Sequence, residues 1–128
     1  MNEDFVPYEL AVKLKEKGYP QRCCGKYDMI GACYFKDGRL YEDGCIAPVE
    51  DCFTAPRIDQ VLKWFREEHA THIEISLGRN GWYFEIIQYE YYEEENEYDC
   101  KLITVSVIND SYEESAIAGI EYTLYNLI

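Results

Sequence analysis

Basic residues are scarce in this chain. Its 128 residues include 12 Lys and Arg against 25 Asp and Glu, which gives a formal net charge of -13 at pH 7. A protein that binds the phosphate backbone of a nucleic acid needs a basic surface, so the composition argues against direct nucleic-acid binding. A basic or neutral protein is the expected kind of partner.

Long apolar runs are also lacking. No stretch approaches the ~18 consecutive apolar residues that a membrane helix needs. The sequence starts with the acidic run Met1–Asp4, and no apolar segment of the kind found in secretory signals follows it. We therefore expect a cytoplasmic protein without a membrane segment, whose six cysteines are reduced thiols.

The sequence contains neither a glycine-rich phosphate loop nor a Cys-x-x-Cys motif, and we expect no cofactor. Zinc sites use thiolates and imidazoles, which makes one set of residues the weak candidate for a metal site: Cys45, Cys52, His69 and His72. The two cysteines stand farther apart than the pairs of structural zinc motifs, and His72 falls in a predicted strand. No catalytic residue stands out, and the pattern favours a protein without catalysis.

The clearest structural pattern lies between Thr54 and Gln88. Within Arg57–His69 the apolar residues fall at helical spacing, on the positions Ile58, Val61, Leu62 and Phe65. Thr54 is the expected cap of this helix, with Pro56 in its first turn. Two alternating apolar runs follow and flank Gly78–Gly81, which predicts an antiparallel hairpin.

The rest of the chain adds further elements around this centre. We expect a first helix over Asp4–Gly18, capped by Asp4, and a hairpin from Tyr27–Phe35 to Leu40 and Tyr41 in which Gly31 marks a bulge. Glu42–Phe53 shows no period and is expected to form a connecting loop.

Downstream, Lys101–Ile108 reads as a strand with Leu102 and Thr104 on one face, and Ser111 and Glu114 form a capping box that opens a C-terminal helix. Ile117, Ile120, Leu124 and Leu127 should form its buried stripe.

Together these elements predict one α+β domain over residues 1–128. Their order is α-β-β-α-β-β-β-α, in two layers with helices packed on one face of an antiparallel sheet of about five strands.

One segment combines acids and tyrosines without any basic residue. From Asn80 to Cys100 there are seven acids and no Lys or Arg. Most of these acids fall within Glu90–Asp99, among Tyr89, Tyr91, Tyr92 and Tyr98, and we expect this stretch at the end of a hairpin. There it forms a solvated loop or presents a negative surface to a basic protein. The candidate binding residues are Tyr91, Tyr92, Glu93, Glu94, Glu95 and Glu97.

Three parts of the chain resemble a group of small uncharacterised proteins from bacteria and their prophages or mobile elements. The matching stretches are Leu10–Tyr19, Ala55–Ile75 around its Gln60–His69 run, and Ser111–Ile128. Arg57 departs from the pattern, because relatives often have Thr there as a helix cap. The resemblance implies an α+β fold and an accessory role in a mobile element, and it implies no activity and no site residues.

These observations predict a small acidic interaction protein that binds its partner through the tyrosine-rich acidic segment. A metal-binding protein or enzyme that uses the Cys/His set is the alternative. A homodimer, formed through a sheet edge or the surface around Trp64, is a further possibility for the assembly.

Overall fold

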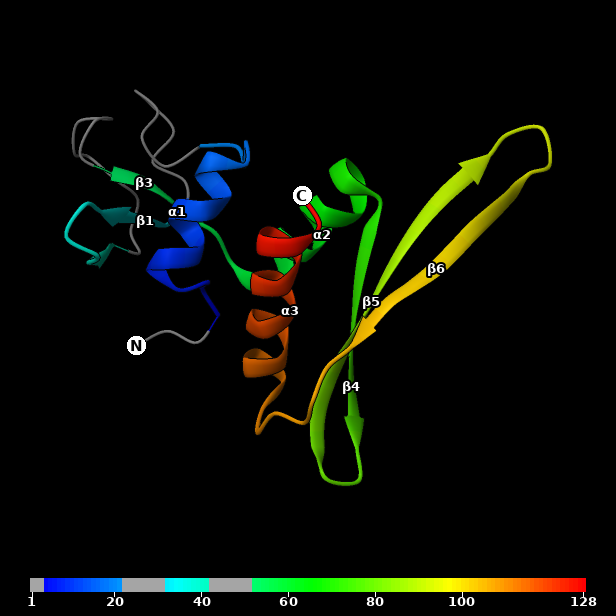
Figure 1. Ribbon diagram of the computed structural model, residues 1–128. Helices are drawn as coiled ribbons and strands as arrows, with labels where there is room; N and C mark the ends of the chain where they lie inside the picture. The colour runs from blue at the N-terminus through cyan, green and yellow to red at the C-terminus, as the bar shows by residue number, and fades with distance from the viewer. Residues whose placement is uncertain (1–3, 22–31, 42–51) are drawn as a thin grey trace. The chain divides into compact units, whose positions relative to one another are not determined.

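The computed structural model describes residues 4–21, 32–41 and 52–128 (Figure 1). It confirms the α+β class and the antiparallel pairing of neighbouring strands. The chain divides into two compact units, residues 1–57 and residues 58–128. The single domain expected over residues 1–128 stays a prediction.

The first unit contains one helix and three short strands in its described residues: α1 (Tyr8–Glu16), β1 (Ala32–Phe35), β2 (Leu40–Tyr41) and β3 (Cys52–Ala55). The strands form a sheet in the order β2-β1-β3. The predicted hairpin is confirmed for β1 and β2, whereas its expected start at Tyr27 and the bulge at Gly31 lie outside the described residues.

Two expectations for residues 52–54 were wrong. Cys52 and Phe53 belong to β3 and not to a loop, because residues 52–55 pair with β1. Thr54 therefore lies inside a strand, where its amide donates to the Gln21 side chain (2.8 Å), and it cannot cap the following helix. Most of the predicted loop, residues 42–51, lies outside the described residues.

Helix α1 buries one apolar stripe, formed by Leu10, Ala11 and Leu14. Its N-cap is Pro7 and not Asp4, because Pro7 has an extended backbone and the helix begins at Tyr8. At the other end the amide of Tyr19 donates to the Leu14 carbonyl (2.9 Å) across Gly18, whose φ is +94°. This is a Schellman ending, which glycine permits because it tolerates positive φ.

Aromatic side chains hold the first unit together. The Tyr34 hydroxyl donates to the main-chain oxygen of Val6, and the Tyr8 ring meets the Tyr34 ring edge to face at 5.6 Å. Tyr8 also donates to the carbonyl of Lys36 at the β1–β2 turn (2.8 Å). Burial of Tyr34 raises the pKa of its phenol, which stays neutral as a hydrogen-bond donor.

The second unit contains helix α2 (Ile58–His69), strands β4 (Thr71–Gly78), β5 (Gly81–Tyr92) and β6 (Glu97–Val105), and helix α3 (Tyr112–Asn126). Its sheet has the order β4-β5-β6, so the described strands form two three-stranded sheets instead of one sheet. Helix α2 buries all four predicted stripe residues. The β4–β5 hairpin is confirmed, with Gly78 paired to Gly81.

Helix α3 packs against β4 and β5. It starts with the predicted cap, because Ser111 Oγ accepts from the amide of Glu114 (3.1 Å). The Glu114 carboxylate accepts from the amide of Asp110 (3.1 Å), one residue earlier than a standard capping box would place it.

The buried side of α3 differs from the predicted stripe. Ile120 and Leu124 are buried, whereas Ile117 and Leu127 are only half-buried. Small residues fill the rest of this side: Ser115, Ala116, Gly119 and Thr123. A Cβ on Gly119 would lie 2.9 Å from Cγ2 of Ile73, so glycine allows the helix to approach the sheet closely.

Strand β6 begins earlier than predicted, at Glu97, and carries a bulge. Ile86 pairs with Thr104 while Ile87 pairs with Leu102, which leaves Ile103 as the extra residue. The expectation that Leu102 and Thr104 share a face was therefore wrong, because the bulge interrupts the alternation between them. Beyond β6 the chain stays beside β5, where Trp82 and Asn109 form an isolated bridge.

Candidate functional site

The β5–β6 hairpin extends past the end of β4. Thr71, the first residue of β4, pairs with Gln88, and from Tyr89 onward β5 pairs only with β6. We call residues 89–100 the arm. It consists of the outer ends of both strands and the turn at residues 93–96, and Figure 1 shows it projecting away from α2 and α3.

The base of the arm is fastened to α2 and to the turn that follows it. The Tyr89 hydroxyl donates to the main-chain oxygen of Arg66, and the Tyr89 amide donates to the carbonyl of Ala70 (3.0 Å). At the tip, Asn96 adopts a positive φ of 53°, its amide donates to Glu93 (3.3 Å), and its side chain accepts from the Tyr91 hydroxyl. The acidic segment is thus mostly paired strand, with a loop only at the tip.

Pairing divides the side chains of the arm between two faces. Directly paired residues of antiparallel strands share a face, and successive residues of one strand alternate. The pairs Glu90–Asp99 and Tyr92–Glu97 therefore lie on one face, the acid face. The pairs Tyr89–Cys100 and Tyr91–Tyr98 lie on the other, the tyrosine face.

Side-chain contacts agree with this division. On the tyrosine face, the ring of Tyr98 lies 4.7 Å from that of Tyr91 and 5.9 Å from that of Tyr89, centroid to centroid. On the acid face, the Tyr92 hydroxyl donates to Oε2 of Glu90 (3.1 Å). This hydrogen bond, with the charges of Glu90 and then Asp99, raises the pKa of Tyr92.

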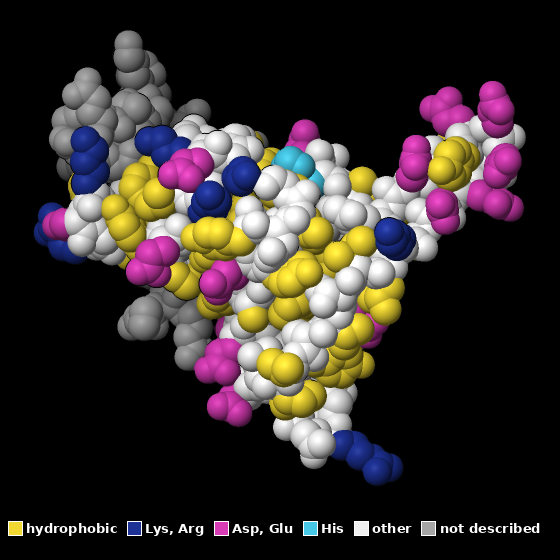
Figure 2. All heavy atoms as spheres, viewed as in Figure 1, with side chains coloured by type: hydrophobic (Ala, Val, Ile, Leu, Met, Phe, Trp, Pro, Cys, Tyr) yellow, Lys and Arg dark blue, Asp and Glu magenta, His cyan; other side chains and the backbone are white. Residues whose placement is uncertain are grey.

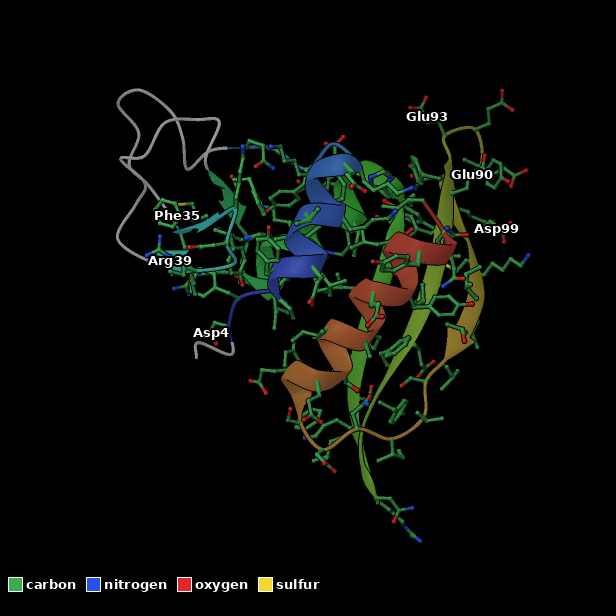
Figure 3. The ribbon with its side chains drawn as sticks, turned by 60° about the vertical axis from the view of Figure 1, so that its left-hand side comes forward. Asp4, Phe35, Arg39, Glu90, Glu93 and Asp99 are labelled. Atoms are coloured by element: carbon green, nitrogen blue, oxygen red, sulfur yellow. The ribbon has the colours of Figure 1, made fainter. Side chains whose placement is uncertain are left out.

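The arm is exposed beyond its base, where Tyr89 is half-buried. Every residue from Glu90 to Cys100 is exposed, including Tyr98 at 64%. Figure 2 shows carboxylate side chains gathered over the end of the arm, and Figure 3 labels Glu90, Glu93 and Asp99 along it. Residues 89–100 contain no Lys or Arg, and the next basic residue along the chain is Lys101. No basic side chain of the arm itself therefore offsets its negative charge.

The six predicted binding residues all lie on the arm, but they do not form one surface. Tyr92 and Glu97 lie on the acid face, Tyr91 lies on the tyrosine face, and Glu93, Glu94 and Glu95 occupy the turn. The candidate binding residues leave out Tyr89, Glu90, Tyr98 and Asp99, although all four belong to the predicted acidic, tyrosine-rich stretch. The alternation of Tyr89, Glu90 and Tyr91 in the sequence is typical of a strand with two chemically different faces. The residues of β6 that pair with them follow only from the register between the two strands.

The two histidines of the candidate metal site have other neighbours. The His69 ring, at the end of α2, meets the Trp64 ring edge to face at 4.6 Å, and Nε2 of His72 lies 2.7 Å from Oε2 of Glu74. Cys52 belongs to β3, and Cys45 lies outside the described residues. Within residues 4–21, 32–41 and 52–128, no group of three or more Cys, His, Asp or Glu is placed to hold a metal ion.

None of the helices in the described part of the chain combines the length and the apolarity that a membrane crossing requires. Comparison with protein-family models, with curated proteins and with solved structures found no match for the chain.

Proposed function

We propose that this chain is a non-catalytic interaction protein that binds a basic protein partner through the arm. The observation that carries the proposal is an exposed, hydrogen-bonded hairpin with carboxylates on one face and a cluster of three tyrosines, Tyr89, Tyr91 and Tyr98, on the other. Complementary charge speeds encounter with a basic partner, and tyrosine rings supply contact area at a small cost in conformational entropy.

The proposed setting is the cytoplasm, in an accessory role for a prophage or another mobile element. The resemblance of Leu10–Tyr19, Ala55–Ile75 and Ser111–Ile128 to small proteins of such elements supports this part of the proposal.

Negative charge supports a basic partner over a second copy of the chain, because two arms of equal charge repel each other. Light scattering at two protein concentrations tests the homodimer.

Replacing the acids at the tip tests the proposal. The variant carries Glu93→Gln, Glu94→Gln, Glu95→Gln and Glu97→Gln, and we expect it to bind a basic partner about tenfold more weakly at low salt, with a smaller loss near 1 M salt, where charges are screened. Affinity capture from a host lysate with quantitative mass spectrometry identifies the partner. Calorimetry with the purified partner then measures the affinity.

A second four-Gln variant provides the matched control. It replaces exposed acids outside the arm, at Glu9, Glu16, Glu68 and Glu121, so that the net charge changes equally. Loss of binding in the arm variant alone supports the arm as the site. Equal loss in both variants would show that only overall charge matters, and equal retention would show that the acids of the arm bind no partner.

A further inference from the structure

The outer edge of β6 is open within the described part of the chain, because β6 is the last strand of the order β4-β5-β6. Such an edge presents unpaired amides and carbonyls that can pair with another extended segment. Strand β6 spans nine residues, contains no proline, and is exposed from Glu97 to Leu102. It offers enough length for an added strand.

The hydrogen bonds of β5 show which residues of β6 face outward. The amide of Tyr89 donates to Ala70, on the β4 side, and the amide of Trp82 donates to Asn109, on the β6 side (2.9 Å). Successive residues of a strand turn to opposite edges, so Gln88, Glu90 and Tyr92 turn toward β6. Their partners Lys101, Asp99 and Glu97 turn back toward β5, which leaves the backbone groups of Tyr98, Cys100 and Leu102 facing outward.

The two faces beside this edge differ in chemistry. On the tyrosine face the edge is lined by Tyr98, Cys100 and Leu102, and Leu102 is 54% exposed. On the acid face it is lined by Glu97 and Asp99, and then by Lys101, which limits the negative charge to the outer part of β6. A strand added here would place alternate side chains on an apolar surface and on a negative one.

From this arrangement we propose that the outer edge of β6 binds an extended basic segment of the partner as a fourth, antiparallel strand. This inference rests on the proposed function and specifies the partner. Apolar residues of the segment lie opposite Tyr98, Cys100 and Leu102, and the intervening basic residues lie beside Glu97 and Asp99. Charge complementarity favours this occupant, because Glu97 and Asp99 attract basic side chains that lie beside them.

Synthetic peptides test the proposal on the wild-type protein. One short peptide alternates lysine and valine, and a second has the same composition with lysines grouped in one half and valines in the other. Because only the alternating peptide matches both faces, we expect it to bind roughly tenfold more tightly at low salt, as measured by fluorescence anisotropy. Equal affinities would overturn the proposal.

Methylation of the peptide backbone tests the edge itself. In the antiparallel arrangement the valine amides face β6 and the lysine amides face away. Methylating the valine amides should weaken binding by roughly tenfold, since several backbone hydrogen bonds are lost, whereas methylating the lysine amides should leave it nearly unchanged. Undiminished binding of the valine-methylated peptide would overturn strand addition.

Two substitutions of Cys100 repeat the test from the side of the protein. Cys100→Pro removes an outward amide and should weaken binding, while Cys100→Val keeps the amide and should not. If the proline variant fails to fold, as judged by circular dichroism, the methylated peptides still decide the question.

The failure of this inference is distinct from failure of the proposed function. If the arm four-Gln variant binds both the grouped and the alternating peptide more weakly than the wild type, with no preference between the two peptides, strand addition is wrong and the arm remains a binding site. If that variant binds every peptide as the wild type does, the proposed function is contradicted.

Discussion

Tyr91 and Tyr92 are neighbours in the sequence but have different surroundings in the structure. The Tyr91 ring packs against the tilted Tyr98 ring on the tyrosine face, while the Tyr92 hydroxyl donates a hydrogen bond to Glu90 on the acid face. The carboxylate beside Tyr92 favours the neutral phenol, because a phenolate would be repelled by it and would lose the hydrogen bond. At the residue scale, position on a strand decides which chemistry a side chain meets.

Replacing Glu90 tests this arrangement. The pKa of Tyr92 is raised mainly by its hydrogen bond to Glu90, then by the charge of Glu90, and less by Asp99. Any stability from this bond is fully present below the ordinary phenol pKa of 10.0 and is lost as pH rises through the raised value. In the Glu90→Gln variant we expect the pKa of Tyr92 to fall toward 10.0, as measured by an NMR titration of its ring signals.

We expect a smaller fall in the pKa of Tyr92 for Asp99→Asn, and no fall for the distant control Glu74→Gln on β4. An unchanged Tyr92 titration in the Glu90→Gln variant would contradict the acid face as described.

At the scale of elements, the segment after β6 approaches the β4–β5 hairpin closely at Gly81. Gly81 has a φ of +143°, and a Cβ there would lie 2.7 Å from the carbonyl oxygen of Asn109 and 2.5 Å from Cγ2 of Ile108. The backbone of Asn109 cannot move aside without breaking its bridge to Trp82. Gly81 therefore closes the β4–β5 hairpin and also leaves space for the backbone of Asn109, which leads into α3.

A pair of glycine substitutions tests this role. Gly81→Ala should destabilise the protein by about 2–4 kcal/mol, because it adds backbone strain to a clash with main-chain atoms. Gly78→Ala, at the other end of the same turn, should cost below about 1 kcal/mol, since its Cβ would lie 3.4 Å from the Tyr83 ring at ordinary contact distance. Urea unfolding measures both, and similar losses would show that the approach of Asn109 is unimportant.

At the scale of the whole molecule, the main feature is an excess of negative charge. The chain has a net charge of -13, and six of its acids lie on the arm, within residues 89–100. Mutual repulsion of this kind keeps a protein soluble and opposes compact states. The hairpin gathers these charges on one exposed projection, where their mutual repulsion opposes folding and dissolved salt can screen it.

Salt should therefore affect stability in a way that depends on the arm. Between about 0.01 M and about 1 M salt the Debye length falls from roughly 30 Å to roughly 3 Å, which suppresses repulsion between exposed charges. We expect the urea midpoint of the wild type to rise over this range, and that of the arm four-Gln variant to rise less. The four-Gln control outside the arm separates local from overall charge, and equal rises in the wild type and the arm variant would contradict local repulsion.

Local interactions made much of the fold predictable. The stripe of α2, the Schellman ending at Gly18 and the Ser111 cap depend on residues within a few positions of one another, so their patterns are readable in the sequence. The ends of elements were less predictable. Thr54 could cap a helix or extend a strand, and only its pairing with Cys33 across the first sheet decided between the two.

The amino-acid sequence by itself determined the helices, the β4–β5 hairpin, and the concentration of acids and tyrosines in one segment, because these follow from periodicity, turn residues and composition. Tertiary structure alone decided how the strands divide into two sheets and how β6 aligns on β5. Successive residues of a strand point to opposite faces of the sheet. The bulge at Ile103 and the pairing of β5 with β6 between that bulge and the tip therefore decide which tyrosine rings touch and which carboxylates lie near Tyr92. That register depends on contacts between residues far apart in the chain, and it is what creates the two faces of the arm.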